Sequence, residues 1–90
     1  MSLASAVTLS ADLLQRRSDL IRLFGEARYQ ERTALAKDRI REVMDLQKSD
    51  NPISAAIAYC KHLAAQHPGE DVSTTQQFVL AAAADLAEGK

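Results

Sequence analysis

The stretch that decides the fold is LIRLFGEARYQERTALAKDRI, residues 20–40. Gly25 stands here among strong helix formers, and large apolar residues become sparse on its C-terminal side. Before Gly25 the apolar residues follow helical spacing on one face. Beyond residue 29 they follow a second face, rotated by roughly a third of a turn from the first. One straight helix cannot direct both faces toward the same core.

The chain around Gly25 therefore has two alternatives. Glycine has the lowest helix propensity after proline, so a break or bend here would let both faces converge on one core. A helix that continues for nearly 40 residues, about 55–60 Å long, would pack its two halves against different partners. An i,i+4 pair of Arg22 and Glu26 favours continuity, whereas the rotated face favours a bend or a second subunit.

The helix that follows this stretch has clear ends. Asp50 or Asn51 can cap its start, with Pro52 at the first helical position, where a missing N–H has no consequence. Pro68 cannot continue the helix, and Gly69 tolerates the turn beyond it. A helix is therefore predicted over 52–66.

A last helix is expected to open at Ser73. Ser73 with Gln76, or Thr74 with Gln77, predicts a capping box, in which the two side chains satisfy free backbone N–H groups at the helix start. The alanine run 81–84 further along would allow the backbone of a neighbouring helix to approach closely.

The composition also favours helices. Hydrophobic residues make up 47% of the 90 residues, and 16 of them are alanine, the best helix former. Three Gly and two Pro leave little turn chemistry for a sheet. We therefore predict an all-α fold, a small bundle of three or four helices in one domain over 1–90. The expected helices are about 10–24 and 26–48, or one long bent helix over both, then 52–66 and 73–88.

The charge is unevenly distributed, although the net charge of −1 favours neither nucleic acid nor a membrane as a partner. Residues 16–48 carry nine basic and six acidic side chains, a net of +3, while residues 49–90 carry two basic and five acidic, a net of −3. The two parts of one bundle could attract each other. Alternatively, a basic face could bind an acidic partner, and Arg28, Arg32 and Arg39 share the stripe that would form this surface.

No set of residues predicts catalysis, a cofactor or a metal. Cys60 and His62 point about 200° apart on a helix, so they cannot act as a nucleophile and its base. His62 and His67 miss the i,i+4 spacing of two metal ligands on one helix face. Paired carboxylates, Asp38 with Glu42 and Asp85 with Glu88, are expected on solvated faces. We expect a protein that is not an enzyme.

The location is predicted from what the sequence lacks. A single Cys suits a reducing compartment. The start of the chain has no basic region and no long apolar run of the kind that a signal peptide or a membrane span needs. A soluble, cytoplasmic protein is the expectation.

Self-association is the function class that the sequence favours most. The apolar face of residues 13–27 is wide for one small helix, and Leu35 and Leu46 fall off the second stripe, where a small chain would expose them. A symmetric homodimer is the commonest solution, and we expect an interaction or adaptor module of this kind. The expected dimer interface consists of Leu13, Leu14, Leu20, Ile21, Phe24 and Ala27.

A nucleic-acid-associated regulator is the alternative. Residues 52–88 read as helix, turn and helix, and the second helix opens with Thr74, Thr75, Gln76 and Gln77. This opening resembles the recognition helix of repressor-type helix-turn-helix proteins, where Gln side chains read adenine. The turn is longer than the usual three or four residues, and the segment is acidic, which weakens this interpretation.

Overall fold

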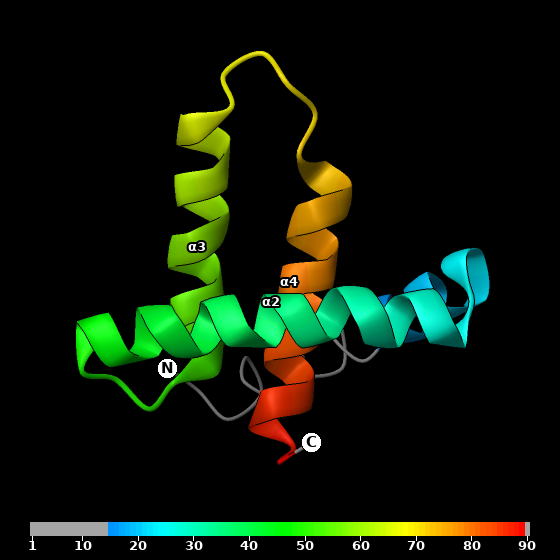
Figure 1. Ribbon diagram of the computed structural model, residues 1–90, viewed down its shortest axis with the longest axis horizontal. Helices are drawn as coiled ribbons and strands as arrows, with labels where there is room; N and C mark the ends of the chain where they lie inside the picture. Colours follow the sequence, from blue (N-terminus) through cyan, green and yellow to red (C-terminus); the bar gives the residue numbers. More distant parts are fainter. Residues whose placement is uncertain (1–14, 90) are drawn as a thin grey trace.

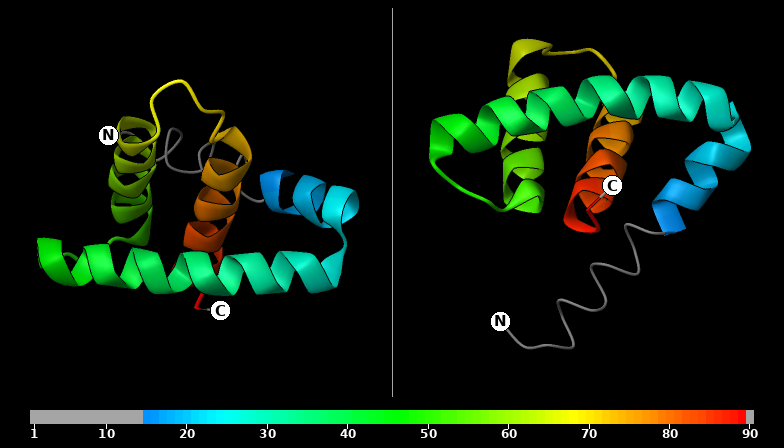
Figure 2. Two further views of the ribbon diagram at one scale, coloured as in Figure 1. Left: turned by 45° about the horizontal axis from the view of Figure 1, so that its top comes forward. Right: turned by 60° about the horizontal axis from the view of Figure 1, so that its bottom comes forward.

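The computed structural model describes residues 15–89, and this part of the chain is all-α, as predicted. Residues 15–24 are helical, followed by α2 (Glu26–Gln47), α3 (Pro52–Gln66) and α4 (Ser73–Ala87). α3 and α4 form an antiparallel hairpin, and α2 lies across it (Figure 1). Residues 15–24 lie beside α4, on the side away from α3 (Figure 2). Residues 10–14 of the first predicted helix lie outside the described residues.

The first helix breaks at Gly25. This residue has φ of +88°. Residues with a Cβ rarely adopt such a conformation. The N–H of Gly25 donates to the carbonyl of Ile21, and its own carbonyl accepts from Tyr29, so the break costs few backbone hydrogen bonds. The alternative of one unbroken helix is therefore wrong.

The side chains around the break do not form the pair that favoured continuity. Arg22 makes its ion pair with Asp19 inside the first segment. Glu26 accepts a hydrogen bond from Gln30 in α2. Each charge is used within its own helix, so the sequence spacing of Arg22 and Glu26 was misleading.

The break brings residues from both apolar faces into one cluster. Leu20 precedes the break and Tyr29 follows it, yet both are 1% exposed and belong to one cluster with Phe78 and Ala81 of α4. The structure adopts the alternative with a break at Gly25. The rest of the second face packs in a separate cluster with α3 and α4, which includes Ala36 and Ile40.

Alanines line the contact between the remaining helices. Ala55 and Ala56 of α3 and Ala82 and Ala83 of α4 are completely buried, together with Ile40 of α2. Because alanine has the smallest side chain that still favours a helix, it allows helix axes to approach closely. All four alanines of the run 81–84 are buried, in agreement with a neighbouring helix that packs against them.

Two helix starts differ in how well they were predicted. Asn51 caps α3 as expected, and its Oδ1 accepts from the N–H groups of Ile53 and Ser54. The capping box of α4 is wrong: the Asp71 carboxylate, just before the helix, accepts from Ser73 instead. The Gln76 side chain turns to α3, because its position on α4 faces that helix.

Candidate functional site: a groove bordered by arginines

A groove lies where α2 crosses the α3–α4 hairpin. It holds a hollow of about 130 Å³ that is open to solvent on one side. Most of its lining is apolar, and the polar residues are two arginines of α2 and one threonine of α4. The lining consists of Arg32, Leu35, Ala36 and Arg39 from α2, Tyr59 from α3, and Thr75, Phe78 and Val79 from α4.

The spacing along α2 explains why these residues share the groove. Arg32, Leu35 and Arg39 are three and four residues apart, so they follow each other along one side of the helix. Tyr29 and Ile40 are buried on the adjacent side, against the hairpin. Arg32, Leu35 and Arg39 therefore lie at the border between the buried and the solvent-exposed faces of α2, and Leu35 is 61% exposed.

The predicted basic stripe thus borders an apolar hollow. The Arg32 guanidinium lies over the Phe78 ring, 5.6 Å from its centroid. Arg39 donates to the Glu42 carboxylate at 3.2 Å, an ion pair in which both side chains are exposed. Arg28 is exposed one turn before Arg32, outside the lining. The sequence located the arginines but not the hollow, which needs residues from three helices.

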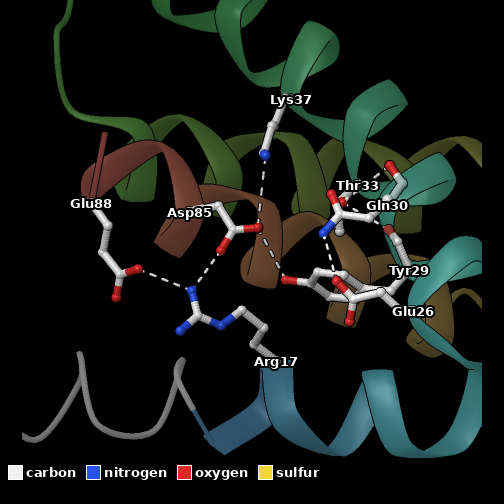
Figure 3. A network of polar contacts seen from close by, with 8 residues as sticks. All are labelled: Arg17, Glu26, Tyr29, Gln30, Thr33, Lys37, Asp85 and Glu88. Atoms are coloured by element: carbon white, nitrogen blue, oxygen red, sulfur yellow. Dashed lines mark hydrogen bonds and ion pairs between the residues drawn. The ribbon is translucent and has the colours of Figure 1, made fainter. Parts of the chain in front are cut away.

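A second polar site surrounds the buried carboxylate of Asp85 of α4 (Figure 3). Asp85 is 5% exposed, and its two carboxylate oxygens have separate partners. Arg17 donates to Oδ1 at 2.7 Å, and the Tyr29 hydroxyl donates to Oδ2 at 3.1 Å. The Lys37 ammonium lies 3.7 Å from Oδ2. The residues come from the segment 15–24, α2 and α4, so this carboxylate joins three helices.

The surroundings of Asp85 alter the pKa of two of its partners. Burial, together with the negative charge and hydrogen bond of Asp85, raises the pKa of Tyr29 far above its ordinary value. Hydrogen bonds to Asp85 and Glu88 raise the pKa of Arg17. Both shifts favour the neutral phenol and the charged guanidinium, which are the forms that donate to Asp85. Among residues 15–89, no buried side-chain N or O atom lacks a hydrogen-bond partner.

The expectation that Asp85 is solvated is therefore wrong. Asp85 follows Phe78 by seven residues and Ala81 by four, which places it on the buried side of α4. That spacing was the signal in the sequence. A charged residue can lie there because Arg17 and Lys37 approach it from other helices, and the spacing within α4 shows neither of them.

The predicted dimer interface is divided by the structure. Leu20 lies in the core of the chain itself, Ile21 is half-buried, and Leu13 and Leu14 lie outside the described residues. Phe24 is 37% exposed and packs on Phe78, with ring centroids 5.3 Å apart. Ala27 is exposed. Their neighbour Leu23, which the prediction omitted, is 74% exposed.

The residues considered for catalysis and metal binding lie apart from both sites. Cys60 is half-buried near the Gln76 carbonyl, and burial raises the pKa of its thiol. His62 is exposed, and His67 pairs with Glu70 at 3.1 Å. No group of His, Cys, Asp and Glu among the described residues could hold a metal ion.

The segment that resembles a helix-turn-helix has a different arrangement from that motif. Its two helices run antiparallel (Figure 1). The helices of the motif instead cross at about 90–120°. Gln76 donates its amide to the Cys60 carbonyl at 3.1 Å. Thr74, Thr75 and Gln77 are exposed at the start of α4.

No protein-family model matches the chain, and comparisons with curated proteins and with solved structures likewise give no match. None of the helices within 15–89 combines the length and the apolar character that crossing a membrane requires.

Proposed function

We propose that this protein is a non-enzymatic interaction module that acts as a homodimer in the cytoplasm. The observation that carries this proposal is the corner at Gly25, where Leu23 (74%) and Phe24 (37%) are exposed next to each other in the chain. Exposed large apolar side chains on a small helical chain favour a protein partner that covers them. The closed hydrogen bonding around Asp85 supports a structural and not a catalytic role for that cluster. The single Cys supports the cytoplasmic location.

The corner at Gly25 is the surface that we assign to the second copy. Leu23, Phe24 and Ala27 lie together there, where the chain turns from the first segment into α2. The nearby charges are balanced, because Arg22 pairs with Asp19. Two identical surfaces can meet only if they do not repel each other, and the corner meets this condition better than the arginine stripe does.

The nucleic-acid alternative has less support. Of the two glutamines that open α4, Gln76 uses its amide within the hairpin, and only Gln77 is exposed for reading a base. Residues 49–90, which contain the hairpin, carry a net charge of −3 (two basic and five acidic side chains), which disfavours contact with phosphates.

Light scattering coupled to size exclusion tests the homodimer. We expect the native chain at twice its mass of 9.8 kDa, and a Leu23→Glu variant at 9.8 kDa with unchanged helical circular dichroism. Leu46→Glu is the matched control, because Leu46 is even more exposed (84%) but lies at the far end of α2, and it should stay dimeric. A native chain that is monomeric throughout would show the homodimer to be wrong.

A further inference from the structure

The groove between α2 and the hairpin has room for one apolar side chain. Its cavity has a volume of about 130 Å³. For comparison, an engineered apolar cavity that binds benzene measures about 150 Å³. Leu35, Tyr59 and Phe78 supply apolar walls. A phenyl ring or a leucine side chain from another molecule matches this space.

The charge beside the groove is positive on both sides of the hollow. Arg32 and Arg39 are seven residues apart on α2. This separation corresponds to about 10 Å along a helix axis. No carboxylate among residues 15–89 pairs with Arg32.

The second arginine is held only weakly by its own chain. Arg39 is bound only to Glu42 among the described residues, and both side chains are exposed. Exposed pairs of this kind contribute less than about 1 kcal/mol. Carboxylates of a partner could therefore bind both guanidinium groups.

We propose that this groove binds an acidic amphipathic helix of a partner protein. One apolar side chain of that helix fills the hollow, and two carboxylates seven residues apart pair with Arg32 and Arg39. This inference rests on the proposed interaction function and names the class of its partner. A second copy fits less well, since its own arginine stripe would bring charge of the same sign.

Model peptides of about 16 residues, which is long enough for partial helicity, provide the test. Two fluorescent peptides based on alanine and glutamine each carry two glutamates seven residues apart. A phenylalanine follows the first glutamate by three residues in one peptide and by four in the other. The two peptides thus test both directions in which the helix can lie along α2. In one companion set glutamine replaces the glutamates, and in the other alanine replaces the phenylalanine.

Fluorescence anisotropy should show saturable binding of at least one acidic phenylalanine peptide, and each companion should bind about tenfold more weakly. The protein variant Arg32→Glu with Arg39→Glu should also lose about tenfold or more in affinity. Glu42→Gln should strengthen binding, by roughly twofold, because it frees Arg39. Arg41→Glu is the matched control; it removes an exposed arginine that pairs with Asp38, and it should leave the affinity unchanged.

Several results would overturn the proposal. The first is that neither acidic peptide reaches saturation at about 1 mM. The second is that the glutamine companions bind as tightly as the acidic peptides. The third is that Arg41→Glu loses as much affinity as the double variant of Arg32 and Arg39. The Leu23→Glu variant, which is expected to be monomeric, separates the two proposals. If it binds the peptide with unchanged affinity, the groove binds the acidic helix whether or not the protein forms a homodimer. If the peptide instead converts a native dimer to monomers, a second copy occupies the groove and the proposed partner is wrong.

Discussion

The inner and outer sides of α2 both carry charged and apolar residues, but they differ in what these residues contact. On the inner side, Tyr29 and Lys37 face Asp85 of α4, and Thr33 donates to the Tyr29 carbonyl at 2.7 Å. On the outer side, Leu35 is 61% exposed between Arg32 and Arg39. Polar groups on the inner side are therefore joined across helices, whereas neither arginine of the outer side pairs with a carboxylate of another helix among the described residues.

The largest effect is expected from Asp85→Ala. The substitution leaves Arg17, Lys37 and the Tyr29 hydroxyl without their shared acceptor. Breaking a buried ion pair in this way costs about 3 kcal/mol or more. Urea unfolding followed by circular dichroism measures the free energy of unfolding.

The exposed Asp38 provides the matched control for Asp85. Asp38 pairs with Arg41 on the solvent side of α2. Asp38→Ala removes this exposed pair and should change the free energy of unfolding by about 0.5 kcal/mol or less. Equal losses in Asp85→Ala and Asp38→Ala would show that the buried carboxylate contributes no more to stability than the exposed one.

A smaller loss is expected from Tyr29→Phe, which removes only the hydroxyl. This hydroxyl donates to Asp85 at 3.1 Å. A hydrogen bond to a charged group should contribute about 2 kcal/mol to stability near neutral pH. The ring contact with Phe78 remains, so the variant should keep its fold.

The pH dependence of stability provides a second test of Tyr29. Its folded pKa is raised above the unfolded value of 10.0, so the neutral phenol is favoured in the folded state. Its stabilisation is complete below about pH 10 and is lost as the pH rises above that value. The free energy of unfolding of the native chain and that of Tyr29→Phe should therefore become more similar as the pH rises from about 8 to about 11. A constant difference between the two over this range would contradict the role assigned to the Tyr29 hydroxyl.

The boundaries of α2 and of the two hairpin helices follow from local features of the sequence. Gly25, Asn51 and Pro52 act locally, through backbone conformation and capping, so the helix boundaries could be read from spacing and residue type. Even there the sequence left the direction of the chain at Gly25 open. The break was decided by Leu20 and Tyr29, which reach one core only if the chain turns.

The two sites could be predicted only in part, because they depend on residues far apart in the sequence. The spacing on α4 places Asp85 on the buried side, but its partner Arg17 is 68 residues away, so the sequence did not show what allows a charge there. Half of the groove could be foreseen, since the arginine stripe lies on one helix. Its other walls come from Tyr59 of α3 and Phe78 of α4, and the spacing within α2 does not show that these residues lie beside it.

The smallest effect is expected from Leu35→Ser on the outer side. Leu35 is 61% exposed, although it is a large apolar side chain. A polar replacement at such a position should change the free energy of unfolding by about 0.5 kcal/mol or less. The same substitution should weaken the acidic peptide in the anisotropy titration, because Leu35 forms part of the wall around the hollow.

The division of α2 predicts this combination of unchanged stability and reduced binding at Leu35. The two measurements are independent, because one follows unfolding and the other follows the peptide. A loss of more than about 1.5 kcal/mol would instead show that Leu35 belongs to the core, since only buried leucines cost that much on truncation.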